Sequence, residues 1–190
     1  MVAIFCLIES HTMTHDNLTG AELQTLREGL HLTRDDLAAL AGVQARTVKH
    51  WENGRSGVPG DVANMVQGFD RQATQAARAT LASIGTSSTV NGATVFLRYR
   101  STEDLNHYEP TLKGLPASVH AAIVSRVRLG LQLVANDQAQ ALRVVWFDPA
   151  DFEAWRTAHQ QPRTPTTRQQ WAAQALPTQA TPHQADQPPA

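Results

Sequence analysis

The clearest chemistry in this sequence lies on one side of a short segment that follows Gly42. Val48 and Trp51 are its apolar residues, and their spacing of three leaves the polar side chains on the opposite side of a helix. That outer side carries Gln44, Ala45, Arg46, Lys49 and His50. Such side chains bond base edges and phosphates, and an alanine lets a helix approach closely enough to touch a thymine methyl. These residue types therefore favour binding of a nucleic acid over catalysis.

The stretch from Thr33 to Arg55 must position this face. Its apolar residues fall where two short helices that meet at a sharp angle would turn toward each other: Leu37, Ala38, Ala41, Val43, Val48 and Trp51. Ala38 is small enough for the second helix to cross over it, and Gly42 can take the positive φ that ends the first helix. The spacing predicts a helix-turn-helix whose second helix enters the DNA major groove.

Capping signals predict where the surrounding helices begin. Thr19 and Glu22 form a capping box that opens a first helix to about Leu30, and Thr33 repeats the device with Asp36. Gln44 is expected to cap the third helix. The expected buried side of the first helix consists of Leu23, Leu26, Leu30 and Leu32.

Glycines end the third helix and precede the fourth. The third helix is expected to run to Asn53 and to stop at Gly54, followed by an exposed turn in which Arg55 suits a phosphate contact. A fourth helix is expected to start within residues 58–61 and to continue to about Ile84.

The net charge of this region is negative, which by itself argues against DNA binding, but the positions of the charged residues do not. The whole chain has a formal net charge of −1, and the five basic and eight acidic residues between Thr14 and Asp70 give −3. Asp35 and Asp36 lie in the first turn of a helix, where they stabilise its positive end. The basic residues instead gather in or just after the third helix, which predicts a local positive potential there.

Several other functions lack support in the sequence. The single Cys6 excludes an intramolecular disulfide and favours a reducing cytoplasm. The first ten residues (MVAIFCLIES) are apolar but too short for a membrane span, and they resemble no signal peptide. Met13 is a candidate alternative start. His11 and His15 have no third metal ligand nearby. We therefore expect no membrane, metal or cofactor.

Beyond a linker of residues 85–92, the pattern changes from helical to mixed. Residues 93–100 alternate as a strand with Val95, Leu97 and Tyr99 on one face, and residues 101–107 form a short helix or turn. Residues 116–134 form an amphipathic helix, and residues 141–147 form a second strand. Asp148 then caps a last short helix with Phe152 and Trp155.

These elements define a mainly α protein with a small α+β module at its C-terminal side. We expect a leader (1–13), a helix-turn-helix domain (14–84), a linker (85–92), an α+β domain (93–159) and a disordered Gln/Pro-rich tail (160–190). Two strands and one or two helices leave apolar faces uncovered. The second domain is therefore expected to dimerise through the amphipathic helix and one strand.

The residues around the bend resemble a known family. Ala38, Gly42, Val48 and the run 51–54 (WENG) resemble the helix-turn-helix of the phage repressor and Cro family, also called xenobiotic-response-element type, over residues 18–70. The string from Ala45 to Val62 is more particularly similar to anti-CRISPR-associated autorepressors.

This resemblance implies a cytoplasmic homodimeric repressor that binds an inverted repeat in its own promoter. It assigns base contacts to Gln44, Ala45, Arg46, Lys49 and His50, and a backbone contact to Arg55.

Other interpretations stay open. The second domain of an antitoxin or ligand-responsive regulator would bind a toxin or a small molecule, and a protein-interaction adaptor would merely retain the fold. RNA stays open as a further ligand. An enzyme has the least support, because two clusters of acidic and histidine side chains lack a nucleophile or a ligand set: Glu103, Asp104 and His107, and Asp148, Asp151 and Glu153.

Overall fold

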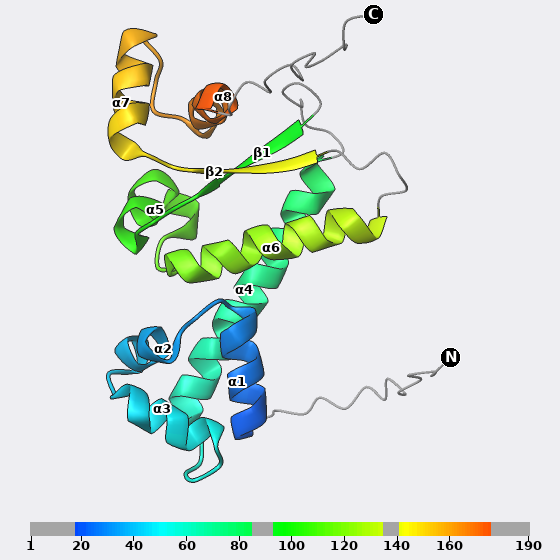
Figure 1. The fold of residues 1–190 in the computed structure, drawn as a ribbon, viewed down its shortest axis with the longest axis vertical. Helices are drawn as coiled ribbons and strands as arrows, with labels where there is room; N and C mark the ends of the chain where they lie inside the picture. Colours follow the sequence, from blue (N-terminus) through cyan, green and yellow to red (C-terminus); the bar gives the residue numbers. More distant parts are fainter. Residues whose placement is uncertain (1–17, 85–92, 135–140, 176–190) are drawn as a thin grey trace, which may run out of the picture. The chain divides into compact units, whose positions relative to one another are not determined.

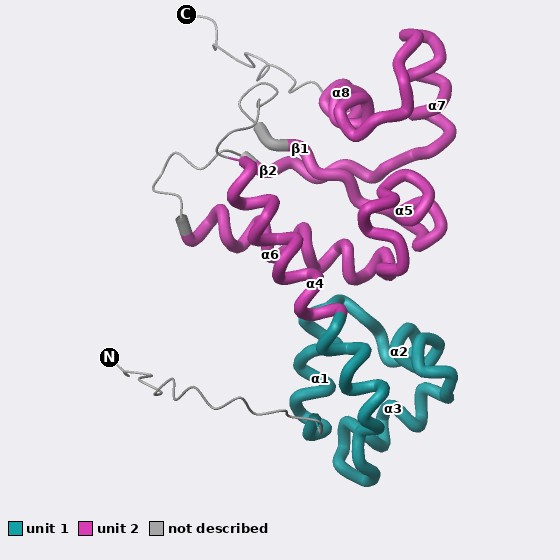
Figure 2. Tube along the Cα trace, turned by 180° about the vertical axis from the view of Figure 1, so that it is seen from behind, with its two compact units in different colours: residues 1–68 teal, residues 69–190 magenta. Residues whose placement is uncertain are grey.

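The computed structural model describes residues 18–84, 93–134 and 141–175 (Figure 1). The chain divides into two compact units, and the boundary between Gly68 and Phe69 lies inside helix α4 (Gly60–Ile84) (Figure 2). The expected first domain, 14–84, included this whole helix, whereas its second half belongs to the second unit. The predictions for the leader, the linker 85–92, His11, His15 and Met13 concern residues outside the described ranges.

The first unit is a helix-turn-helix domain. Its helices α1 (Gly20–Gly29), α2 (Arg34–Ala41) and α3 (Ala45–Glu52) precede α4, as the capping signals predict. Both capping boxes are present, with the hydroxyls of Thr19 and Thr33 accepting from the backbone N–H groups of Glu22 and Asp36. Gly42 has φ +66°, so the left-handed turn between α2 and α3 is confirmed.

A compact apolar core joins these helices. Its fully buried side chains include Leu23, Leu30, Leu37, Val48 and Val66. Two details differ from the prediction. Leu26 is only half-buried, and Gln44 occupies the N-cap position of α3 without a side-chain capping hydrogen bond.

The second unit contains a two-stranded parallel sheet. Strand β1 (Ala93–Arg98) pairs with β2 (Ala141–Trp146) in a register that runs from Ala93 opposite Ala141 to Arg98 opposite Trp146. Helix α5 (Thr102–Tyr108), the 3₁₀ turn η1 (Pro110–Leu112) and helix α6 (Ala117–Val134) lie between the strands in sequence. Both strands and the amphipathic helix are confirmed, although β1 ends at Arg98 rather than Arg100.

The core of this unit is aromatic. Phe147 lies at ring-centroid distances of 5.1 Å from Tyr99, 4.6 Å from Tyr108 and 5.4 Å from both Phe152 and Trp171. Phe152 lies on α7 (Pro149–Ala158), whose N-cap is Asp148 as predicted.

The prediction of a disordered tail over 160–190 is wrong for residues 165–175. They form α8 (Pro165–Ala175), which begins after Thr164, whose hydroxyl accepts a 3.1 Å hydrogen bond from the backbone N–H of Thr167. Trp171 and Ala172 are buried, and Trp171 Nε1 donates to Asp151 at 2.8 Å. Thr167 and Arg168 are buried as well, and Arg168 pairs with Glu109 at 2.8 Å, so packing and an ion pair together fix a segment whose composition is mostly polar.

Helix α6 is buried in its own unit over residues 119–124 and at Val127, whereas Leu129 and Leu133 near its end are exposed. Its buried residues lie on more than one side of the helix: Val119, His120, Ala121, Ala122, Ile123, Val124 and Val127. Arg126 bonds Asp70 at 2.6 Å, and Gly130 lies against Leu81, which fixes α6 to the end of α4 that belongs to the same unit. No described helix has the length and hydropathy needed to span a membrane.

Candidate DNA interface

The exposed side of α3 borders a hollow of about 840 Å³ in the first unit. Its lining combines residues of α1, α2 and α3 with the turn that follows α3: Arg27, Glu28, Thr33, Arg34, Asp35, Ala45, Arg46, Lys49, His50 and Arg55. The structure thus brings together five of the six residues predicted to contact DNA. Gln44 is exposed at the start of α3 but does not line the hollow.

The hollow has a positive local charge. Five of its lining residues are arginine or lysine and two are acidic, although the whole chain has a net charge of −1. Arg46, Lys49 and Arg55 are exposed, and Val48 and Trp51 on the other side of α3 are buried. The helix therefore presents a polar, cationic side to solvent and packs its apolar side into the core, as the sequence predicts.

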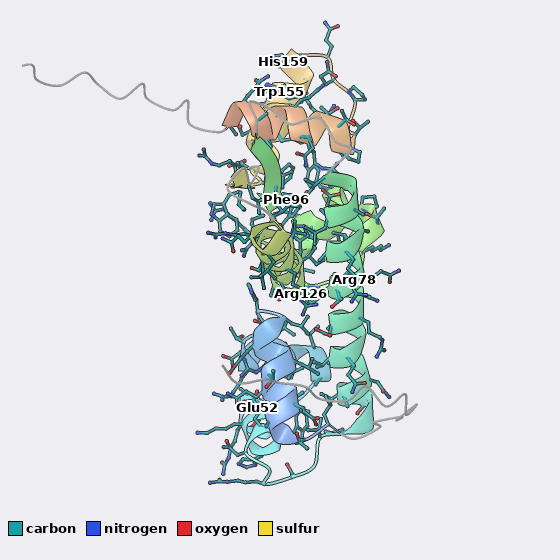
Figure 3. All side chains as sticks on the ribbon, turned by 90° about the vertical axis from the view of Figure 1, so that its right-hand side faces the viewer. Glu52, Arg78, Phe96, Arg126, Trp155 and His159 are labelled. Atoms are coloured by element: carbon teal, nitrogen blue, oxygen red, sulfur yellow. The ribbon has the colours of Figure 1, made fainter. Side chains whose placement is uncertain are left out.

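A buried carboxylate holds together the three helices that line the hollow. The side chain of Glu52, which Figure 3 labels, is fully buried, and its two oxygens accept hydrogen bonds of 2.5 Å from Arg27 Nε and Arg34 Nε. Arg27 also donates to the backbone carbonyl of Leu32 at 2.8 Å. Because these residues come from α1, α2 and α3, one carboxylate links all three helices.

Arg34 is the site residue that the sequence analysis does not assign. Its Nε is occupied by Glu52, but its side chain is 43% exposed and borders the same hollow as Arg46. Its guanidinium therefore combines a fixed position with access to solvent, which suits a phosphate contact. The pairing of Arg34 with Glu52 depends on how α2 and α3 pack, so no local signal in the sequence marks Arg34 as a site residue.

Gly20, at the start of α1, allows this helix to approach the end of α3 closely. A Cβ on Gly20 would lie 2.3 Å from the carbonyl oxygen of Trp51 and 2.4 Å from that of Glu52. The beginning of α1 therefore packs directly on the backbone at the end of α3.

Comparison with protein families supports this description. Residues 19–81 match the family model described as "Helix-turn-helix domain". The match covers α1 to α3 and most of α4, and it supports a DNA-binding regulator as the class of protein. No curated protein matches the chain in a sequence comparison.

The two clusters weighed as catalytic are occupied by structural contacts. Asp104 bonds the hydroxyl of Ser101 at the N-cap of α5, and His107 lies 3.1 Å from Arg163. Asp148 caps α7. Burial raises the pKa of Glu153, but hydrogen bonds from Arg163 and Arg156 outweigh it and hold that pKa below its usual range. In the described ranges, no three His, Cys, Asp or Glu side chains are arranged to hold a metal ion.

Proposed function

We propose that this protein is a sequence-specific transcriptional repressor that binds an inverted repeat as a homodimer. The observation that carries the proposal is the cationic hollow beside α3, where Ala45, Arg46, Lys49, His50 and Arg55 meet on one surface. In this interpretation α3 lies in the major groove, and Gln44 reaches base edges from its first turn.

The residues divide between sequence preference and affinity. The guanidinium of Arg46 suits a bidentate contact with guanine, which is worth about 1–3 kcal/mol of discrimination against another base. Lys49 and His50 bind base edges or phosphates, and Arg55, in the turn after α3, binds the phosphate backbone. Arg34 adds a second backbone contact from the start of α2.

Repression then follows from occlusion. Two α3 helices in a dimer occupy successive major grooves, about 34 Å apart, and exclude polymerase from a promoter. We propose that the site lies upstream of the protein's own gene, in an operon of anti-CRISPR type, because the run 45–62 resembles autorepressors of that kind.

The decisive experiment measures binding to the DNA upstream of the gene and to a scrambled duplex of the same length at the same salt concentration. The proposal expects at least ~10³-fold tighter binding to the upstream DNA and a steep fall in affinity with salt. Equal affinity for both duplexes would contradict a specific repressor and favour an adaptor.

A further inference from the structure

An open groove follows strand β2 in the second unit. Its walls are Arg143 to Trp146 of β2, with Asp148, Asp151, Trp171 and Ala175. Four consecutive strand residues take part, although successive side chains of a strand point to opposite faces of the sheet. The groove therefore runs along an edge of β2, and we call it the β2-edge groove.

This edge carries backbone groups that the sheet leaves unpaired. Within the described ranges the sheet has two strands, so β2 pairs with β1 on one side only. A two-stranded sheet is marginal by itself, and an open strand edge is a template for pairing with a further strand.

The groove also exposes a fixed aromatic anchor. Val144 and Trp146 are 45% and 47% exposed. The guanidinium carbons of Arg98 and Arg100 lie 5.1 Å and 4.5 Å from the centre of the Trp146 ring and hold it in place. Exposed tryptophans that are already ordered are frequent centres of binding energy in protein interfaces.

The charges of the groove favour a second copy of this chain as its occupant. Arg143 lies at one end, and Asp148 and Asp151 lie at the other. A two-fold axis near Val145 reverses the direction of a second β2, and so brings each Arg143 beside the acidic end of the other copy. Opposite charges at the two ends of one groove are self-complementary in this way, as an interface between identical surfaces requires.

We propose that two copies pair along β2 as antiparallel strands, so that the two sheets form one sheet of four strands. Val144 and Trp146 are covered by the partner's β2, and Arg143 pairs with the partner's Asp148 or Asp151. This inference rests on the proposed homodimeric repressor and assigns its dimer interface. It differs from the expectation that the amphipathic helix α6 contributes to the interface, because residues 119–124 and Val127 of α6 are buried in its own unit and the exposed Leu129 and Leu133 lie outside the groove.

Cysteine cross-linking of the full chain tests the position of the axis. In a Cys6→Ser background, Val145→Cys places a thiol beside its own copy, where a disulfide needs Cα atoms about 4.4–6.8 Å apart. Mild oxidation should convert most of this variant to a covalent dimer. Leu133→Cys is the matched control, since Leu133 is 78% exposed on α6 and outside the groove. Cross-linking confined to Leu133→Cys would overturn the inference.

Sedimentation equilibrium tests the charge pairing. Arg143→Glu should weaken self-association at least ~10-fold, whereas Arg128→Glu, the same charge change on the exposed side of α6, should leave it unchanged. Arg143→Glu that lowers DNA affinity but not self-association would identify the groove as a nucleic-acid contact and overturn the interface. The interface would also be overturned if the wild-type chain stayed monomeric at the concentrations at which it binds its operator. The proposed function fails by a separate result, equal binding of upstream and scrambled DNA by the wild-type chain.

Discussion

The carboxylate of Glu52 accepts a 2.5 Å hydrogen bond from Nε of Arg27, and both side chains are buried, with exposed fractions of 0% and 7%. A second guanidinium, that of Arg34, bonds the other oxygen of the same carboxylate. The one acidic residue of α3 is thus paired inside the domain. Arg46, Lys49 and Arg55 take no part in this pairing, so the hollow keeps a positive charge although the region has a net negative charge.

Glu52→Gln should destabilise the first unit by about 3–5 kcal/mol, because it leaves the buried Arg27 without its buried counter-charge. Urea unfolding followed by circular dichroism measures this change. Glu28→Gln is the matched control: Glu28 also contacts Arg27, at 3.2 Å, but its side chain is 56% exposed, so we expect little change. Equal effects of the two substitutions would contradict a structural role for the buried pair.

Gly20→Ala should destabilise the same unit by about 1–3 kcal/mol, because the added methyl collides with backbone carbonyls that cannot rotate away. Gly29→Ala, at the other end of α1, meets no atom within 4 Å and should be neutral or stabilising by up to ~1 kcal/mol. Thermal melts of both variants provide the comparison. A Gly20→Ala variant as stable as Gly29→Ala would contradict the close packing of α1 on α3.

Local signals in the sequence were sufficient to predict the first unit. The capping boxes at Thr19 and Thr33 and the glycine at 42 each act within four residues, so the helix limits follow from short segments. The pairing of Glu52 with Arg27, 25 residues away, depends on how the helices pack, and no local pattern contains it. For the same reason, local patterns in the sequence indicate five lining residues of the hollow but not Arg34.

In the second unit, local signals were not sufficient to predict how the elements pair and pack. Alternation predicted both strands, but their parallel pairing joins residues such as Val95 and Arg143, which are far apart in sequence. The polar composition of residues 160–190 predicts a disordered tail, which is wrong for residues 165–175. Their order depends on Trp171, which packs on Phe147 and Phe152 of other elements.

Arg46→Ala should reduce the preference for the upstream DNA, because it removes a bidentate contact worth about 1–3 kcal/mol at one base pair. Competition binding against the upstream duplex and against duplexes with single base changes measures this preference. We expect tolerance to appear at one base pair of each half-site. An unchanged pattern of preferences would exclude Arg46 from base contact.

Arg55→Ala should instead weaken binding of specific and scrambled DNA by similar factors. A phosphate contact carries no sequence information, and its loss should reduce the slope of log affinity against log salt by about 1. Titrations at several salt concentrations provide the slope. A change in sequence preference with an unchanged slope would contradict the assignment of Arg55 to the backbone.

Stability should fall as the pH decreases from about 6.5 to 4, in part because of His120. Burial, together with the charge of Arg98, lowers the pKa of His120 from 6.5 to about 4. The unfolded chain therefore binds a proton at a pH where the folded chain does not, and acidification favours unfolding by up to about 3 kcal/mol. His120→Phe removes this titration and should flatten the dependence in urea unfolding between pH 7 and pH 4.5. If the free energy of unfolding of His120→Phe depended on pH as steeply as that of the wild type, other titrating groups would be responsible for the dependence.

Trp171→Ala should destabilise the second unit by about 3–5 kcal/mol, because it removes a buried ring and the 2.8 Å hydrogen bond to Asp151. Trp155→Ala is the matched control. Trp155 is half-buried on α7, stacks on His159 at 4.5 Å and donates to Gln174, so its removal leaves the aromatic core intact. Urea unfolding followed by near-ultraviolet circular dichroism separates the two variants. A Trp171→Ala chain as stable as Trp155→Ala would contradict a contribution of the buried Trp171 ring to the stability of the second unit.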